Sequence, residues 1–171
     1  MIQSKAHAER AKPCSFCSVD PTFCPHLGPI CRDVWRDADD VGAVPVVAAV
    51  LMRERSVLLC KRPAHKRHGG LWEFPGGKLL PGETLGEGMQ RELREELQLE
   101  LTGPLAYLGR EQDPDSAFVL HFVAAHATGD PASVEHDEVT WVAPVEMDGL
   151  ELAPGDRTFV EAWRAGSPKT F

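Results

Sequence analysis

The feature that most constrains this chain is a group of carboxylates at helical spacing that follows a glycine-containing loop. Pro75-Gly76-Gly77 ends a short apolar segment, and Thr84-Leu85-Gly86-Glu87 then matches a capping box. In that motif the threonine hydroxyl and the glutamate carboxylate satisfy free backbone donors at the start of a helix. The spacing therefore predicts a helix from Thr84 to about Leu97. Because residues three or four apart are neighbours on a helix, one side of it carries Glu92, Glu95 and Glu96.

Two interpretations of these carboxylates are open. A run of charge is usually a solvated helix face. Three like charges repel one another, however, and a divalent cation bound by oxygen ligands would stabilise them, since Mg²⁺ takes carboxylates, waters and substrate phosphates. The preceding glycines allow the backbone to approach a ligand closely. The combination predicts a metal–phosphate site, in which Arg91, four residues before Glu95, could orient that carboxylate.

The charge of the whole chain excludes several classes of partner. The formal net charge is -8, and the segment from Glu83 to Glu100, with six acidic and two basic residues, supplies half of it. An acidic protein of this kind is not expected to bind nucleic-acid polymers or anionic membrane surfaces. The start of the chain lacks an apolar signal core, and the most apolar run, Val44 to Met52, is too short to span a membrane. We therefore expect a cytoplasmic protein.

Apolar segments at strand spacing dominate the rest of the chain. Val44 to Met52 and Val57 to Cys60 are β-branched and aliphatic runs on either side of a polar turn, which predicts a hairpin. Further short strands are expected at residues 71–74, 105–108, 118–125 and 139–142. A second helix is expected after Pro154, with Phe159 and Trp163 on its buried face. Strands mixed with two helices predict an α/β (α+β) domain with a mixed sheet between helices.

At this point the residues carry a family resemblance. The pattern Gly77-x5-Glu83-x7-Arg91-Glu92-Leu93-x-Glu95-Glu96-x-Gln98-Leu99 resembles the Nudix box, and Trp72 to Lys78 looks like the MutT branch, whose members hydrolyse nucleoside triphosphates. The resemblance covers about residues 41–165 and implies a Nudix-like α/β/α sandwich. It departs at Gln98, where the family usually has glycine in left-handed geometry, so glutamine there should cost stability rather than chemistry.

The resemblance also implies a set of metal ligands and catalytic groups. Mg²⁺ (or Mn²⁺) would be held by Glu92, Glu95, Glu96 and the carbonyl of Gly76, with Glu92 as the base that activates water. Arg91 would support these carboxylates, and Glu83 would brace the loop through hydrogen bonds. A further metal-binding or catalytic glutamate is often found in a later loop of MutT-like enzymes, and Glu135 fits that place better than Glu138.

Four more residues are candidates for binding substrate. By resemblance Arg62 would reach the substrate phosphates, with a solvent-facing charge at a strand edge as the alternative, and Lys78 could act similarly. Asp156 lies where the MutT branch reads the base, although an aspartate there also suits a helix N-cap. Phe74 could stack on the base, as could Phe118 or Phe122, but each is more often a core residue.

The expected activity is Mg²⁺-dependent hydrolysis of nucleoside triphosphates, ordinary or oxidised, to a monophosphate and pyrophosphate. ADP-ribose or a dinucleoside polyphosphate is an alternative substrate. A module that senses a nucleotide without turnover is the rival from another class, and the intact carboxylates disfavour it.

Residues 1–40 form a separate cysteine-rich arm, and residues 41–171 form the main domain. The arm contains Cys14, Cys17, Cys24 and Cys31, with His26 as an alternative ligand. Four such ligands suit tetrahedral Zn²⁺, whereas free thiols in an unstructured arm are the other interpretation. The protein partner of the arm is unknown. The fifth cysteine, Cys60, lies in a predicted strand and is expected in the core.

Overall fold

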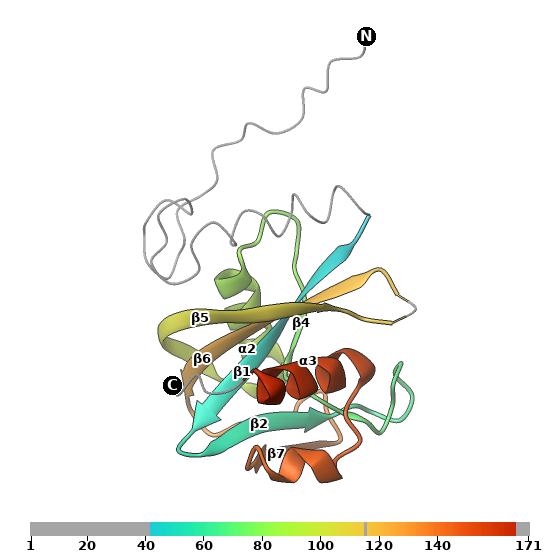
Figure 1. Cartoon of the computed structure of the whole chain (residues 1–171). Coiled ribbons are helices and arrows are strands. Elements are labelled where there is room, and N and C mark those ends of the chain that lie inside the picture. Colours follow the sequence, from blue (N-terminus) through green and yellow to red (C-terminus); the bar gives the residue numbers. More distant parts are fainter. Residues whose placement is uncertain (1–41, 115, 167–171) are drawn as a thin grey trace.

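The two apolar runs form the first hairpin of the fold, as predicted. In the computed structural model, which describes residues 42–114 and 116–166, β1 (Val44–Arg53) pairs antiparallel with β2 (Ser56–Lys61). Both strands are buried along most of their length, because their aliphatic side chains pack on both faces of the sheet. The hairpin therefore forms the centre of the molecule (Figure 1).

The described residues form one mixed sheet of seven strands. Its main order is β3 (Trp72–Glu73), β2, β1, β6 (Phe118–Thr128) and β5 (Glu100–Gln112), while β4 (Gly76–Lys78) pairs with β1 and β7 (Glu138–Val142) with β2. The pairing of β1 with β6 is parallel and the other ladders are antiparallel, which confirms the predicted mixed sheet.

One strand is much longer than predicted. Residues 105–108 were expected as a short strand, but β5 runs over thirteen residues with two register shifts against β6. The irregularities interrupt the alternation of apolar and polar side chains, and Gly103 and Gly109, both at positive φ, lie beside them. The expected segment, residues 105–108, overlaps both irregularities, so the pattern did not show where the strand begins and ends.

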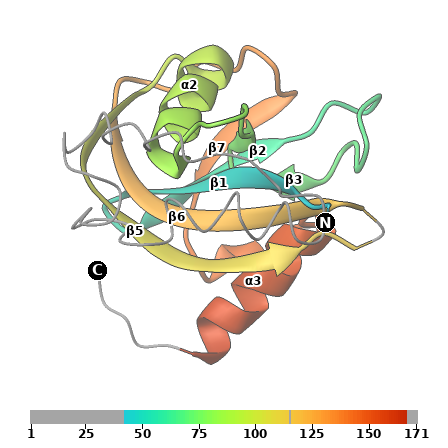
Figure 2. The same ribbon diagram turned by 90° about the horizontal axis from the view of Figure 1, so that it is seen from above.

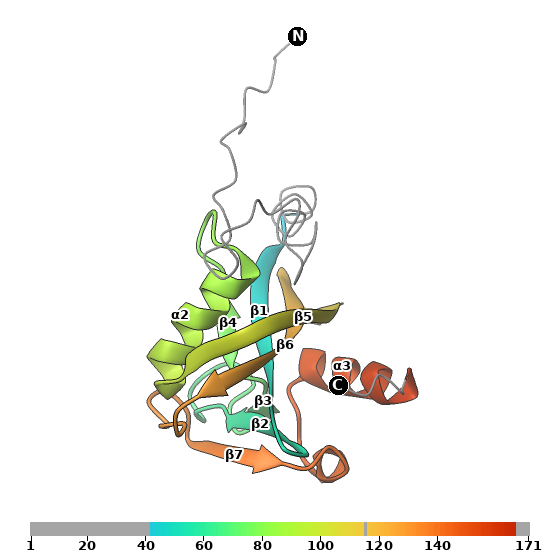
Figure 3. The same cartoon turned by 90° about the vertical axis from the view of Figure 1, so that its left-hand side faces the viewer.

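Helices lie on opposite faces of the sheet. α2 (Leu85–Leu97) covers one face and α3 (Pro154–Ala165) the other, as Figures 2 and 3 show from two directions. A short 3₁₀ helix, η2 (Glu146–Gly149), precedes α3. The capping box of α2 is formed as predicted, with Thr84 Oγ1 accepting from the Glu87 N–H at 3.2 Å and the Glu87 carboxylate accepting from the Thr84 N–H at 3.0 Å.

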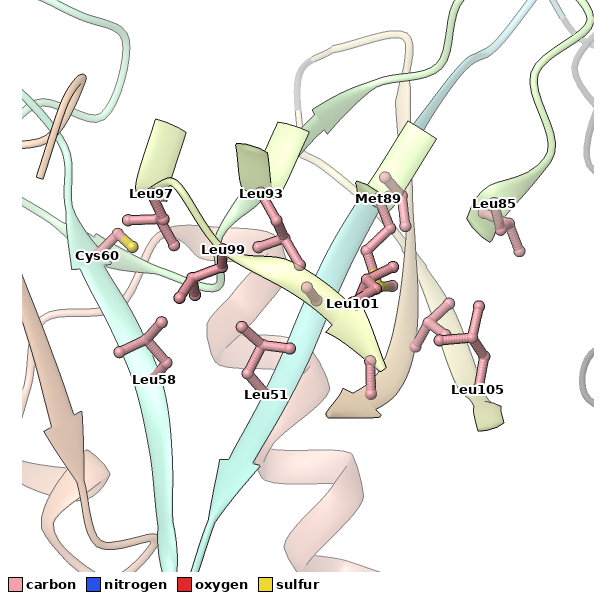
Figure 4. Close-up of a cluster of buried hydrophobic side chains, with 14 of the residues drawn as sticks. Leu51, Leu58, Cys60, Leu85, Met89, Leu93, Leu97, Leu99, Leu101 and Leu105 are labelled. Carbon is pink, nitrogen blue, oxygen red and sulfur yellow. The ribbon is translucent and has the colours of Figure 1, made fainter. Parts of the chain in front are cut away.

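Each face of the sheet has its own apolar core. On the α2 face, the buried side of the helix packs on strands β1, β2 and β5 through Leu85, Met89, Leu93 and Leu97, as Figure 4 shows. Cys60 is fully buried in this cluster, as predicted. On the α3 face the core is aromatic, with Phe122 stacked on Phe159 at 3.8 Å between ring centroids. The two cores fix α2 and α3 against the sheet. The loops that connect the strands with these helices are therefore anchored on both faces of the sheet.

Two predictions about the start of the chain are not tested. The cysteine-rich arm, with Cys14, Cys17, Cys24, Cys31 and His26, lies outside the described residues, as does the boundary placed at residue 40. Within the described residues, no helix has the length and apolar character needed to cross a membrane.

Candidate active site

Arg91 is the centre of a network of carboxylates on the exposed side of α2. Its guanidinium makes a bidentate contact with Glu83, at 2.8 and 2.9 Å, and also reaches Glu92 at 2.7 Å and Glu95 at 3.3 Å. The contact with Glu95 is the i, i+4 pair expected from the sequence. One planar cation thus fixes three acidic side chains, a geometry that the forked guanidinium favours over a lysine.

Glu83 braces the loop between β4 and α2. Its carboxylate accepts from the Leu80 N–H at 2.7 Å, and the hydrogen bonds from Arg91 lower its pKa below the usual value. Arg91 in turn donates to the carbonyl of Lys78 at 2.9 Å, so the same side chain attaches α2 to the end of β4. These hydrogen bonds hold the loop at both ends.

Glu92 lies directly over the backbone of β4. A Cβ atom placed on Gly77 would lie 2.4 Å from a carboxylate oxygen of Glu92, so the carboxylate occupies the space that any other residue would fill. This close approach is the physical reason for a glycine at position 77. Burial raises the pKa of Glu92, against the opposing effect of Arg91.

Glu96 is the most buried of the three helix carboxylates. Its side chain is turned toward the glycine loop, where Oε2 accepts from the Gly76 N–H at 3.2 Å. Burial raises its pKa to about 7, while the nearby His136 opposes that rise. A buried carboxylate with one neutral donor is costly in its charged form, so this position favours either a proton or a cation.

The donor chemistry fits a hard divalent ion that is completed by water and substrate. Glu92, Glu95 and Glu96 offer carboxylate oxygens. The side chains of Glu92 and Glu96 are mostly buried, so water solvates their charge poorly. Within residues 42–114 and 116–166, however, no three His, Cys, Asp or Glu side chains converge closely enough to hold a metal ion by themselves. Carboxylate oxygens suit Mg²⁺, which keeps several waters and binds substrate phosphates rather than an all-protein cage.

Two residues that the sequence did not single out lie beside these carboxylates. Glu73, in β3, contacts Arg62 Nη1 through one oxygen and His136 Nε2 through the other, the latter at 3.5 Å. His136 has a side chain that is only 3% exposed. Arg62 is therefore not a solvent-facing charge at a strand edge, because its guanidinium is paired with Glu73 and mostly covered. In the sequence, His136 directly follows Glu135, but the prediction considered only the glutamate as a functional residue.

Glu135 itself lies on the surface. Its carboxylate is half exposed and contacts Lys66 Nζ at 3.1 Å. Its loop is nevertheless attached to the end of α2, since Val134 N–H donates to the Glu96 carbonyl at 3.1 Å. The predicted metal role of Glu135 stays a prediction.

Asp156 lies on the α3 side and is not a helix N-cap. The helix begins after Ala153, with no side-chain cap, and Oδ1 of Asp156 instead accepts from the Phe74 N–H at 3.0 Å. The side chain is buried, which raises its pKa to about 8, with Glu73 adding to the rise. The N-cap alternative was wrong because Asp156 is the third residue of α3 rather than the residue that precedes the helix, and its carboxyl group accepts from the Phe74 N–H as well as from its own backbone N–H.

The remaining predicted substrate residues lie on this same face. Phe74 is buried and packs edge-on against Phe122 and Phe159, so it is part of the core. Lys78 extends away from the carboxylates, with Nζ 4.6 Å from the centroid of the Phe118 ring. The candidate residues therefore lie in two groups. The carboxylates belong to α2, whereas the aromatic residues and Asp156 lie on the α3 face, and Glu73 lies between the two groups.

Comparison with known proteins shows what the chain is similar to. A family model for the NUDIX domain matches residues 42–163. A CTP pyrophosphohydrolase of Escherichia coli (strain K12) is 38% identical over 125 residues, which are 71% of this chain and 92% of that protein. An 8-oxo-dGTP diphosphatase of Proteus vulgaris is 42% identical over 50 residues, which are 29% of this chain and 45% of that protein. The crystal structure of a MutT NUDIX hydrolase from Burkholderia pseudomallei matches with a TM-score of 0.63 at 28% identity, over 70% of this chain and 96% of that one.

Proposed function

The chain belongs to the Nudix family, as a MutT-like hydrolase of pyrophosphate bonds, and on that basis we propose that it cleaves nucleoside triphosphates to a monophosphate and pyrophosphate. The reaction depends on Mg²⁺ or Mn²⁺ and takes ordinary or oxidised nucleotides. The observation that carries the proposal is the set of helix carboxylates turned toward the glycine loop, with Glu92 against Gly77 and Glu96 against Gly76.

Glu92, Glu95 and Glu96 would hold the divalent ion, together with a carbonyl of the glycine loop at Gly76. When bound, such an ion would neutralise phosphate charge, and it would lower the pKa of a water molecule bound to it. Members of the Nudix family typically use a divalent metal. The excess negative charge of this helix then attracts phosphates only through the cation, which explains how an acidic protein binds an anionic substrate.

Glu92 is the base in this proposal. Its pKa is raised by burial, which makes the carboxylate a stronger proton acceptor than one in water. Arg91 donates to it at 2.7 Å and so holds it in a single orientation over Gly77. Arg91 acts through Glu92 and Glu95 rather than on the substrate, because its guanidinium is already engaged by three carboxylates.

The base of the nucleotide would lie on the α3 side, near Asp156. With a pKa of about 8, this carboxyl group keeps its proton at neutral pH and can donate a hydrogen bond to a base. The names of the relatives point to CTP and to 8-oxo-dGTP. Arg62 would contact the phosphates. The same role for Lys78 would require its ammonium group to leave the Phe118 ring.

The decisive experiment is a panel of ordinary and oxidised nucleoside triphosphates, with ADP-ribose and a dinucleoside polyphosphate, each assayed with Mg²⁺ and with EDTA. We expect a monophosphate and pyrophosphate from at least one triphosphate, and no products in EDTA. If only ADP-ribose is cleaved, to two monophosphates, the proposed substrate class is wrong. Binding without cleavage of any compound would instead identify a sensing module.

Glu92→Gln tests the assignment of the base. The change removes the proton acceptor and keeps the shape, so kcat should fall by about 10²–10⁴-fold. Glu161→Gln, at an exposed position on α3, is the matched control and should behave as the parent protein. Full turnover by Glu92→Gln would show that another group accepts the proton.

A further inference from the structure

The loop that carries His136 is fixed between two elements of the site. Ala132 N–H donates to the Leu97 carbonyl at 2.9 Å, and Val134 N–H to the Glu96 carbonyl at 3.1 Å, which attaches the loop to the end of α2. At its other end, Asp137 N–H donates to the Lys61 carbonyl at 3.0 Å, at the end of β2. These backbone contacts fix the path of the loop, and the imidazole that it carries is covered, with 3% of the side chain exposed.

The imidazole itself is an unusual buried group. His136 Nδ1 is the one buried side-chain nitrogen or oxygen without a hydrogen-bond partner in the described part of the chain. Leaving a buried polar atom unpaired costs stability, and such atoms in native structures call for an explanation. An apolar side chain would fill the same space without this cost. The other nitrogen, Nε2, makes the contact with Glu73 that accounts for a histidine here.

Glu73 transmits that contact to Arg62. One carboxylate oxygen of Glu73 faces His136 at 3.5 Å, and the other is paired with Arg62 Nη1. Arg62 Nε also donates to the Arg67 carbonyl at 2.6 Å, so the guanidinium is held on two sides. Because a carboxylate is planar, fixing one of its oxygens restricts the direction in which the other can accept. His136, Glu73 and Arg62 thus form one chain of contacts.

We infer that His136 is a positioning residue, which holds the carboxylate of Glu73 so that Arg62 is aligned for the substrate phosphates. The inference rests on the proposed function, in which Arg62 contacts phosphate. His136 touches neither substrate nor metal in this assignment. It acts through Glu73, and its effect should appear in substrate binding more than in the chemical step.

The first test compares His136→Leu with the parent protein and with His126→Leu, a matched control at an exposed position on β6. Misalignment of Arg62 weakens ground-state binding, so KM should rise about tenfold with kcat changed by less than about twofold. Thermal denaturation should show that the leucine variant is folded. An unchanged KM would overturn the inference, and so would a loss confined to kcat.

A double-mutant cycle separates positioning from a general effect on the fold. If His136 acts through Arg62, His136→Leu should add nothing to the rise in KM caused by Arg62→Gln. Full additivity of the two changes would overturn the inference, because it would show that they act independently.

A second pair of variants serves if the leucine variant does not fold. Glutamine places its amide nitrogen near the position of Nε2, whereas asparagine reaches only the position of Nδ1. His136→Gln should therefore keep a KM near that of the parent, and His136→Asn should raise it. Equal KM values in the two variants would contradict a role for the Nε2 contact.

Binding of magnesium pyrophosphate, measured by calorimetry, separates this inference from the proposed function. His136→Leu and Arg62→Gln should weaken that binding to a similar degree, whether or not the protein turns over a nucleotide. If the parent protein cleaves no triphosphate but the His136 variant still loses pyrophosphate affinity, only the proposed function fails. If the parent is active and the variant binds pyrophosphate equally well, only the positioning role fails.

Discussion

At the scale of single residues, burial sets the protonation of the acidic groups in this site. Glu96 and Asp156 have pKa values raised to about 7 and about 8, in both cases mainly because burial penalises the charged form. Glu83, beside Arg91, shows the opposite shift, since hydrogen bonds from the guanidinium favour its charged form. Burial therefore favours the protonated form of Glu96 and Asp156, whereas the hydrogen bonds from Arg91 favour the charged form of Glu83.

Asp156 gives a prediction about stability and pH. Its folded pKa of about 8 lies above the usual value of 3.8, so its contribution to stability is fully present below pH 3.8, is lost progressively as pH rises from there to 8, and is gone above pH 8. The loss is at most about 1.4 kcal/mol per pH unit. Asp156→Asn keeps an oxygen that can accept from Phe74 N–H and removes the titration.

Denaturation in EDTA between pH 6 and pH 9 measures this effect. The stability of the parent protein should fall more steeply with pH than that of Asp156→Asn, and the variant should be the more stable protein at pH 9. Other groups, including Glu96, titrate in both proteins, so the difference between the two curves isolates Asp156. Parallel curves would show that Asp156 is already charged at neutral pH.

At the scale of elements, the contact between α2 and β4 sets the geometry of the carboxylates. The Cβ of any residue at position 77 would meet the carboxylate of Glu92, not a rigid part of the backbone. Gly77→Ala should therefore displace Glu92 with little loss of stability, because a flexible side chain can swing aside. We expect kcat to fall at least about tenfold, as misplaced catalytic groups cost rate steeply.

Steady-state kinetics and thermal denaturation of Gly77→Ala measure the two effects separately. Gly149→Ala, in η2, is the matched control, since a Cβ there would meet no atom within 4 Å. A Gly77→Ala enzyme with the parent kcat would show that Glu92 need not lie over β4 for catalysis.

The end of α2 gives a prediction about stability alone. Gln98 is the C-cap residue, with φ 58° and ψ 33°, the left-handed geometry that the comparison with the Nudix box led us to expect. A side chain in this conformation is strained, and glycine is not. Gln98→Gly should raise the free energy of unfolding by about 1 kcal/mol in urea denaturation. Lower stability would mean that contacts of the glutamine side chain outweigh its backbone strain.

At the scale of the whole molecule, the sheet separates two chemical environments. The carboxylates belong to α2, and Asp156 with the aromatic core belongs to the α3 side. Figure 3 shows these two helices on opposite faces of the sheet. Trp72 and Phe74 belong to the α3-side core, while Glu73 between them points the other way, as alternation along a strand requires. The short segment around β3 therefore connects the two parts of the proposed site.

A metal-dependent change in stability should report on the assembled site. Glu96, with a pKa of about 7, is mostly protonated at pH 5.5 and mostly charged at pH 8.5. A ligand must be deprotonated to bind a metal. Mg²⁺ should accordingly raise the melting temperature more at pH 8.5 than at pH 5.5, and Glu96→Gln should lose most of that difference. Equal shifts at both pH values would exclude Glu96 as a ligand.

Local physics allowed the sequence to predict the helix and its carboxylates. The capping box and the i, i+4 contact of Arg91 with Glu95 depend on neighbours in the chain, whereas the brace at Glu83 and the left-handed geometry at Gln98 were expected from the resemblance to the Nudix box. The first hairpin and the mixed character of the sheet followed from the length and spacing of apolar runs. The metal and substrate roles assigned by resemblance stay predictions, to be tested by the experiments above.

Tertiary structure alone decided which distant groups meet. Glu73 and His136 are separated by more than sixty residues, and no local pattern shows that one faces the other. The same is true of Asp156, whose carboxyl group accepts from the Phe74 N–H of a distant segment, and of Lys78, which lies over Phe118 rather than among the carboxylates. Spacing along the chain determines which residues share a helix or strand face, whereas the pairing of strands and the packing of two cores determine what each face meets.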